Sequence, residues 1–299
     1  MRMSLQLSNQ MKGMLLVALS GTMFGSLGYL GTHLLSFHLS IENMLFWRFL
    51  IASLWIAAGM ILFAKNAAFE MHAVSLMKLF ILGALYYSGS SIFYFLASKQ
   101  IGTGLAMVIF YSFPVFVALL AWLLGDWQVN RYAIAALVAV VLGLLLMKGQ
   151  GGDAVNLSGV FFAIIAAFSY ALYVYGQRHH SRNLDARLLT LLVCVGNTVI
   201  FFLYSCYTKQ FLFPGTWQAW VFICAIGIVA TALPIQLLLE GLKYISPVKA
   251  SILSSLEPVI TVLVGIVLLH ESISTMQALG VMVLLSGALF IQFERSTEE

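Results

Sequence analysis

The chain has very few charged residues for its length. Only 9% of its 299 residues are Asp, Glu, Lys or Arg, and 62% are hydrophobic. Soluble globular domains contain about 25% charged residues, which keep their surfaces hydrated. The composition therefore predicts an integral membrane protein and excludes a large soluble catalytic domain.

Features that would indicate other functions are also scarce. The three cysteines, Cys194, Cys206 and Cys224, have neither Cys-x-x-Cys nor zinc-site spacing, so we expect packed free thiols, no metal and no other cofactor. The lysines and arginines occur without interleaved aromatic clusters, so we expect no nucleic-acid partner. The sequence has neither a glycine-rich phosphate loop nor a cluster of catalytic carboxylates or histidines, so we expect neither an ATPase nor an enzyme.

Ten apolar runs fill most of the chain, and each is about long enough to cross a bilayer as a helix. Uniformly apolar runs of this length differ from the short alternating strands of a membrane β-barrel. We therefore predict an all-α integral membrane protein with ten transmembrane helices. The predicted spans are residues 12–32, 43–64, 77–98, 103–124, 131–148, 158–178, 187–208, 217–241, 248–269 and 275–293.

Basic residues in the short loops predict the orientation of the chain. With the N-terminus in the cytoplasm, eleven of the 15 lysines and arginines lie on cytoplasmic segments, three lie on outside segments, and Arg48 lies within a span. The opposite orientation would reverse this bias. We therefore predict that both termini are cytoplasmic. The short loops and the lack of plant or animal targeting signals favour a multi-pass protein of the bacterial inner membrane.

The last five spans resemble the first five. Aligning Pro114 with Pro258 also aligns Lys99 with Lys243, and the apolar runs after the two prolines end at equivalent positions. Because each half has an odd number of spans, the second half enters the membrane from the opposite side, which predicts two inverted repeats. The predicted segments are a first five-helix repeat, a linker, a second five-helix repeat and a cytoplasmic tail, at 1–148, 149–157, 158–293 and 294–299.

One segment of the second half resembles a known family. Residues 250–260 are a run of small residues followed by Leu-Glu-Pro-Val, and the next apolar stretch ends at His270-Glu271. This pattern is similar to the ninth helix of the EamA family in the drug/metabolite transporter superfamily, although that family usually has Gly at the position of His270. The resemblance implies ten spans and transport of small organic molecules, frequently the export of amino acids or related metabolites.

Glu257 is the leading candidate for a functional residue. It lies nine residues into the span 248–269, or about 14 Å deep at 1.5 Å per residue, near the middle of the bilayer. A carboxylate at that depth is costly unless it is paired, hydrated or protonated. Two interpretations remain open. Glu257 couples transport to protons or binds a cation, or it braces the backbone carbonyl that Pro258 leaves without a donor.

Other polar and aromatic residues near mid-depth predict the wall of a substrate cavity. Tyr87, Ser91 and Tyr94 lie on one helical face, too deep for the interfacial aromatic belt. For each residue alone, the alternative is packing against a neighbouring helix or bonding to its own helix. The predicted cavity residues are Tyr87, Ser91, Tyr94, Tyr111, Gln236, Ser254 and Glu257.

Prolines and one arginine interrupt the apolar spans. We predict that Pro114, Pro234 and Pro258 bend their helices and take part in gating. Arg48 lies about five residues into the second span, where its long side chain can snorkel to the outer interface. The alternative is an inward guanidinium that binds a carboxylate or a phosphate.

Together these features predict a secondary-active transporter that exports a small organic metabolite, an amino acid or a related amphipathic compound, by alternating access. Its partners would be this small molecule, membrane lipid and, through Glu257, protons; a homodimer is left open. The alternatives are an importer of a nucleoside-like metabolite and a facilitator or channel without ion coupling.

Overall fold

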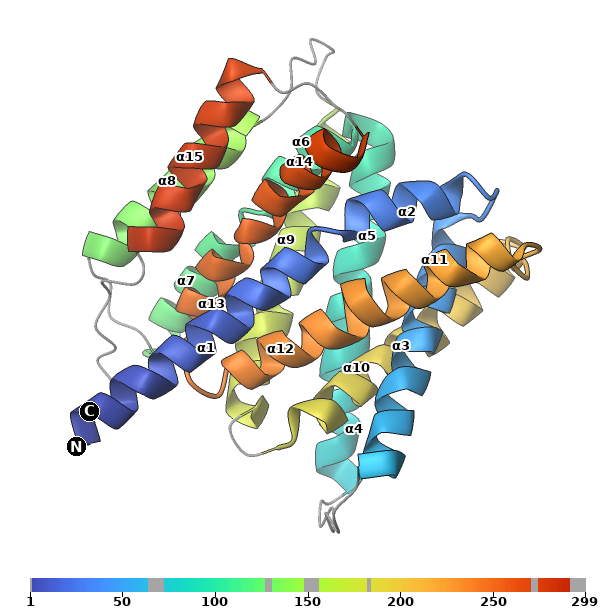
Figure 1. Cartoon of the computed structure of the whole chain (residues 1–299), viewed down its shortest axis with the longest axis horizontal. Helices are drawn as coiled ribbons and strands as arrows, with labels where there is room; N and C mark the ends of the chain where they lie inside the picture. The colour runs from blue at the N-terminus through green and yellow to red at the C-terminus, as the bar shows by residue number, and fades with distance from the viewer. Residues whose placement is uncertain are drawn as a thin grey trace.

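The fold is built from helices packed side by side (Figure 1). The computed structural model describes residues 2–63, 73–126, 131–147, 156–181, 184–269 and 274–290, and no strand occurs within these ranges. Two segments, η1 and η2, are π-helices. In chain order the elements are α1 (Arg2–Phe24), α2 (Leu27–Leu35), α3 (Ile41–Phe63), α4 (Ala73–Ile81), η1 (Leu82–Tyr87), α5 (Ser88–Ile101), α6 (Thr103–Phe110), α7 (Phe113–Leu123), α8 (Arg131–Met147), α9 (Leu157–Ser181), α10 (Ala186–Tyr207), α11 (Trp217–Gly227), η2 (Ile228–Ala232), α12 (Leu233–Gly241), α13 (Pro247–Ser254), α14 (Leu256–Leu269) and α15 (Thr275–Phe290).

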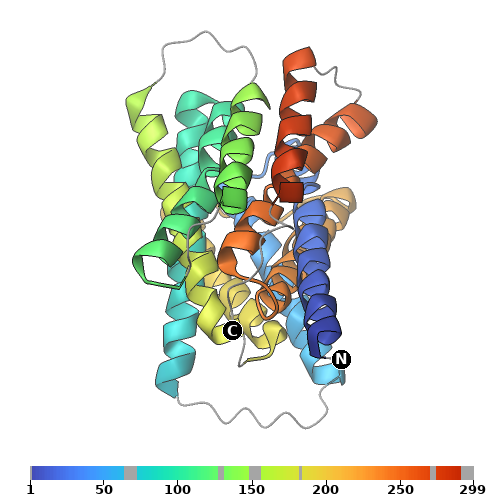
Figure 2. The same cartoon turned by 90° about the vertical axis from the view of Figure 1, so that its left-hand side faces the viewer.

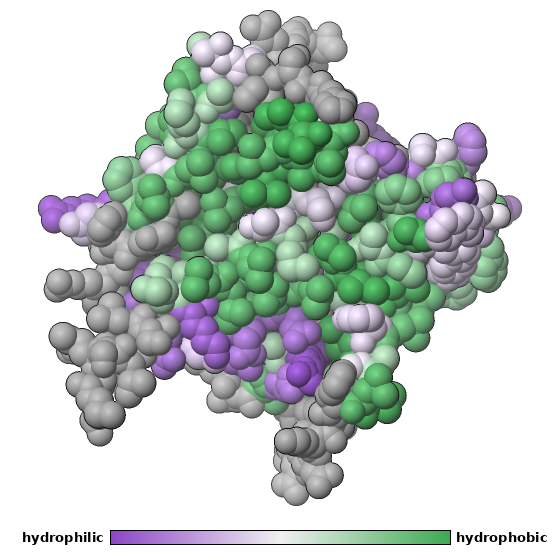
Figure 3. All heavy atoms as spheres, in the orientation of Figure 1, coloured by the Kyte–Doolittle hydropathy of each residue, from purple (hydrophilic) through white to green (hydrophobic). Residues whose placement is uncertain are grey.

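Eight helical runs within the described residues are long and apolar enough to cross a membrane, and two shorter apolar helices follow the fourth and the eighth of them. Apolar side chains cover most of the face in Figure 3, and polar ones gather toward its edges. These observations confirm the predicted all-helical membrane architecture. The count of ten crossings stays a prediction, because the two shorter helices, α8 and α15, have 17 and 16 residues.

The two halves of the chain are interleaved. The four most extensive helix contacts all join one half to the other: α1 packs on α12, α3 on α10, α5 on α9 and α8 on α15. Figures 1 and 2 show α8 and α15 side by side. This pair depends on glycine, because a Cβ on Gly143 would lie 2.8 Å from the carbonyl oxygen of Gly280. Neither half therefore completes its packing alone.

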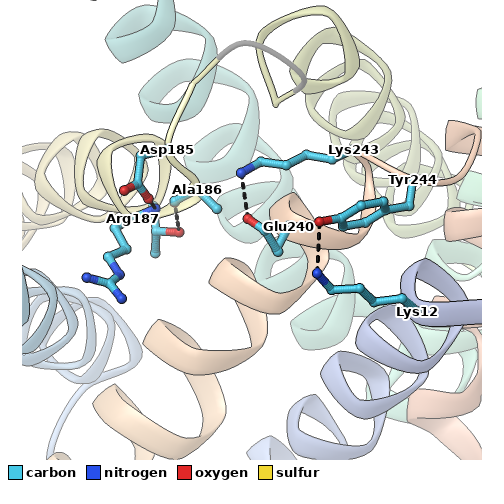
Figure 4. A network of polar contacts seen from close by, with 8 residues as sticks. Lys12, Asp185, Ala186, Arg187, Glu240, Lys243 and Tyr244 are labelled. Carbon is cyan, nitrogen blue, oxygen red and sulfur yellow. Dashed lines mark hydrogen bonds and ion pairs between the residues drawn. The ribbon is translucent and has the colours of Figure 1, made fainter. Parts of the chain in front are cut away.

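Polar contacts at equivalent positions join the halves at the two ends of the bundle. Where α1 meets α12, Lys12 Nζ donates to the hydroxyl of Tyr244 over 2.9 Å (Figure 4). Where α9 meets α5, Ser158 Oγ donates to Gln100 Oε1 over 2.5 Å. We call the end of the bundle at Lys12 the N-side and the end at Ser158 the far side.

Interruptions of the spans recur at matching places in the two halves. The helix pairs α6–α7 and α13–α14 are each separated by a short break, and η1 and η2 interrupt the runs α4–α5 and α11–α12. Pro114 and Pro258 lie in the first turns of α7 and α14, where a proline does not remove a helical hydrogen bond. The breaks therefore bring helix ends into the middle of the bundle.

Two of the predicted segments lie outside the described residues. They are the tail 294–299 and the linker 149–157, apart from residues 156 and 157. The cytoplasmic location of both termini stays a prediction.

Candidate functional site

The interrupted helices bring Glu257 and Tyr111 together in the middle of the bundle. Tyr111 lies in the break between α6 and α7 and is 2% exposed. Its hydroxyl and the carboxyl of Glu257 interact. Glu257 lies in the first turn of α14, where the positive end of the helix dipole favours a carboxylate. It is surrounded by protein yet keeps part of its surface accessible.

Aromatic side chains from α3, η1, α5, α6, α7 and α9, and from the break between α6 and α7, form a continuous group beside this pair. The ring of Tyr87 stands nearly perpendicular to that of Tyr173, with centroids 5.0 Å apart, and Phe113 meets Tyr170 in the same way at 4.8 Å. Such edge-to-face pairs are the favoured geometry for aromatic rings. We call this group the aromatic cluster; its members are Phe49, Tyr87, Tyr94, Phe110, Tyr111, Phe113, Tyr170 and Tyr173.

Two members of the aromatic cluster, Tyr170 and Tyr173 on α9, are absent from the residues predicted from the sequence. The Tyr173 hydroxyl is buried and has no hydrogen-bond partner among the described residues. A signal for both was present, because three tyrosines fall within six residues of one predicted span, at Tyr170, Tyr173 and Tyr175. The cluster therefore presents hydroxyl groups as well as rings.

Arg48 points into the bundle. Its side chain is buried, and its Nε donates to Thr231 Oγ1 of η2 over 2.5 Å. Thr231 in turn donates to the carbonyl oxygen of Ile226 over 2.7 Å, a five-residue spacing that suits the π-helix. The guanidinium also interacts with the hydroxyl of Tyr87, the last residue of η1. The structure thus favours the inward alternative over snorkelling.

The remaining predicted cavity residues divide into two groups. Ser91 and Ser254 donate to carbonyl oxygens one turn back in their own helices, at 3.1 and 2.9 Å. Their hydroxyl hydrogens are therefore engaged within the helix and are not available to donate to a ligand. Tyr94 packs on Phe110, with ring centroids 5.4 Å apart, and Gln236 is half-buried on α12. Within the described part of the chain, the Gln236 side chain makes no hydrogen bond, so its amide is available.

Each predicted proline lies next to an interruption of its span. Pro114 and Pro258 follow the two breaks, and Pro234 follows η2 directly. The carbonyl oxygen of Pro234 accepts a hydrogen bond from Ser20 Oγ of α1 over 2.7 Å. Pro234 thereby links the interrupted run to the neighbouring helix.

The bundle is packed more tightly at the N-side than at the far side. At the N-side α13 packs against α7 and α9, and all eight of its residues are buried. The equivalent helix at the far side is α6, in which only Ala106 is buried among the described side chains. Within the described residues, α6 and α14 share no contact comparable with that between α7 and α13. The central residues are therefore shut off from the N-side more completely than from the far side.

A shallow hollow opens near the far side between α3, α5 and α10. It includes the charged residues Glu42 and Lys99, and its wall also contains Leu45, Phe95, Phe201 and Tyr204. No group of three or more His, Cys, Asp or Glu residues that could hold a metal ion occurs in the described ranges. We call this feature the far-side hollow.

Comparisons with known proteins agree on one family. The EamA-like transporter family matches residues 11–148 and again residues 157–293. An "Uncharacterized transporter" of Archaeoglobus fulgidus is 27% identical over 66% of this chain and 69% of its own. The "Uncharacterized inner membrane transporter YicL" of Salmonella typhimurium is 23% identical over 95% of this chain and 96% of its own.

A crystal structure shares the fold, with a TM-score of 0.77 and 17% identity over 93% of this chain and 95% of the other. The relatives are named as transporters, and the helical runs are those of a multi-pass membrane protein. The chain therefore belongs to the EamA-like transporter family.

Proposed function

We propose that this transporter is a secondary-active carrier that exports a small amphipathic metabolite, an amino acid or a related compound, across a bacterial inner membrane. The observation that carries the proposal is the partly accessible Glu257 beside Tyr111, enclosed by the aromatic cluster where two broken helices meet. A carboxylate next to aromatic faces suits a ligand with a cationic amine and an apolar body. A bare inorganic ion would have no use for the aromatic wall.

Alternating access accounts for the arrangement of the helices. One unit comprises α5, α6, α7 and α9, and the other comprises α1, α2, α12, α13 and α14. The two units touch at the N-side, where α13 meets α7 and α9 and where α12 meets α9. Rocking of the units would separate these N-side contacts and bring α14 toward α6, which would expose the site to the other face.

Proton coupling through Glu257 supplies a driving force. A carboxylate inside the membrane is stabilised by a cationic ligand, and a protonated carboxyl is stabilised without one. Exchange of a proton for the ligand at Glu257 would therefore keep the site nearly neutral in both states. With the N-side in the cytoplasm, as the basic residues predict, a proton entering from the far side would accompany release of the metabolite there.

Uptake into proteoliposomes tests this function. The purified protein is offered a labelled pool of amino acids, nucleosides and amines at two internal pH values, with Glu257→Gln alongside. We expect saturable uptake of the amino acids that responds to the pH gradient and is lost in the variant. Glu240→Gln is the matched control, because Glu240 lies at the N-side in an ion pair with Lys243 (Figure 4).

The other possible outcomes of the uptake experiment distinguish the alternative functions. Saturable uptake that ignores pH in both proteins would remove Glu257 from the coupling role and indicate a facilitator. Uptake of nucleosides alone would favour an importer of that class. Uptake of no pool member would count against a metabolite carrier.

A further inference from the structure

Arg48 is a buried cation that has no ion-pair partner among the described residues. Its side chain is 5% exposed. A guanidinium carries five N–H donors in a rigid fork. Among the described residues, its hydrogen-bonding partners are Thr231 at Nε and the hydroxyl of Tyr87, and its Cζ lies 5.0 Å from the centroid of the Phe49 ring. Most of the fork is therefore left for another acceptor.

No carboxylate of the described residues neutralises Arg48. The ion pairs found there join Arg178 to Asp126 and Lys243 to Glu240. Glu257 attracts Arg48 electrostatically, but the two side chains do not form an ion pair. Burial of an unpaired guanidinium is costly, and the cost falls when an anion arrives. Arg48 and Glu257 are thus opposite charges close enough to interact without forming an ion pair.

The surroundings of Arg48 fix its orientation. Thr231 belongs to η2 and Tyr87 to η1, so one guanidinium contacts both π-helices. π-Helical turns are rare and occur frequently at functional sites. Thr231 accepts from Nε, and the Tyr87 hydroxyl takes up part of what remains, so the two terminal nitrogens, with four N–H groups between them, still have donors for a ligand. A planar fork with two parallel N–H groups matches the two oxygens of a carboxylate.

The far-side hollow lies on the same face of α3 as Arg48. Ile41 and Leu45, which line the far-side hollow, precede Arg48 by seven and three residues on α3. These spacings place all three on one face of the helix, about one turn apart. The hollow therefore lies one to two turns from the guanidinium.

We propose that Arg48 binds a carboxylate of the transported molecule, with Thr231 as a positioning residue and the Tyr87 hydroxyl as a second donor. The cationic group of the same molecule faces Glu257 and Tyr111, and its apolar body lies on the aromatic cluster. This inference rests on the proposed function, because both concern the same central site. It narrows the substrates to metabolites that bear a carboxylate.

A matched pair of substrate pools tests the inference. Proteoliposomes receive a labelled pool of α-amino acids, or the same pool as α-carboxamides, which keep the amine and the side chain but lose the negative charge. For the natural protein we expect uptake of the acids to exceed uptake of the amides by about 10- to 100-fold, as loss of a charged hydrogen bond gives. Arg48→Gln should abolish this preference. Arg48→Lys should keep part of it, because the charge remains and the fork is lost.

Two results would overturn the inference while leaving the carrier function intact. One is equal uptake of acids and amides by the natural protein, and the other is an unchanged preference in Arg48→Gln. If the natural protein takes up neither pool, the proposed function loses its support, and the second measurement decides the role of Arg48.

That measurement is the unfolding midpoint in detergent without any ligand. If Arg48 serves to bind the anion of a ligand, Arg48→Met removes an unpaired buried charge. The unfolding midpoint should then equal or exceed that of the natural protein. If Arg48 is only a structural brace for η2, the midpoint should fall by about 2 °C or more. A fall of that size, matched by Thr231→Val, would overturn the inference.

Discussion

Helices α6 and α13 occupy equivalent places in the two halves of the chain and have opposite environments. Residues of α6 are largely apolar, yet only Ala106 among its described side chains is buried. Helix α13 contains Lys249 and two serines, yet all of its residues are buried. Burial here does not follow the polarity of the residues. It follows from which end of the bundle is closed.

This contrast bears on the proposed alternating-access mechanism. If the two halves were packed symmetrically, α6 would meet α14 as α13 meets α7. Since that does not occur in the described residues, the bundle is packed more closely at the N-side, and the proposed alternating access would make this a state closed at the N-side. A state closed at the far side would exchange the environments of the two helices.

The largest difference between the two helices should appear when a side chain at matched positions is truncated to alanine, which leaves a cavity where the helix is well packed. Leu253 of α13 and Ile109 of α6 align, and Leu253 is 3% exposed while Ile109 is half-buried. Leu253→Ala should lower the free energy of unfolding by about 2–5 kcal/mol, and Ile109→Ala should cost about half as much or less. Thermal unfolding in detergent measures both. Equal losses would show that the packing difference is absent in solution.

Cysteine labelling should resolve the same contrast under native conditions. Met107 is half-buried, and the equivalent Ser251 is fully buried. After Cys206 and Cys224 are replaced by serine, Met107→Cys should react with a water-soluble thiol reagent about tenfold faster than Ser251→Cys, as about 1.4 kcal/mol of protection gives. A substrate that drives the opposite state should reverse the order. Similar rates for the two cysteines in every condition would argue against two such states.

The smallest effect should come from the polar contacts at the bundle ends. Tyr244→Phe removes the hydroxyl that accepts from Lys12 at the N-side, and Ser158→Ala removes the equivalent donor to Gln100 at the far side. Exposed polar contacts contribute little to stability, so each unfolding midpoint should change by about 2 °C at most. If Tyr244→Phe alone raised the labelling of Ser251→Cys, the N-side contact would be part of the closed state. A large loss of stability in either variant would contradict this ranking.

Much of the fold could be predicted from the sequence because a membrane simplifies the problem. Long apolar runs must be helices in lipid, and Pro114 and Pro258 mark places where hydrogen bonding changes. Depth along a span also singled out Glu257 and Tyr111, since few polar groups occur that far from the interface. These predictions require only the position of each residue along its own helix, and no knowledge of how the helices pack.

The rest of the site depends on which face of each helix points inward, and the sequence does not contain that information locally. Helix α3 is apolar on all sides of Arg48, so no periodicity distinguishes an inward arginine from a snorkelling one. Tyr170 and Tyr173 become part of the aromatic cluster only because α9 packs on α5 of the other half. The two π-helices likewise follow from packing, as Gly83 and Gly227 approach Val193 and Ile51 closely.

The interleaving of the halves sets an order for biosynthesis. Helix α5 is synthesised long before its packing partner α9, and the interval between the synthesis of α1 and that of its partner α12 is longer still. At about 5–20 residues per second, the intervening synthesis takes about 3–10 s for α5 and α9, and about 10–40 s for α1 and α12. During that time the inward faces of the helices in the first half, including Arg48, lack the second half and are covered only by one another, lipid, water or the insertion machinery. The nascent chain therefore depends on its surroundings until its second half has been inserted.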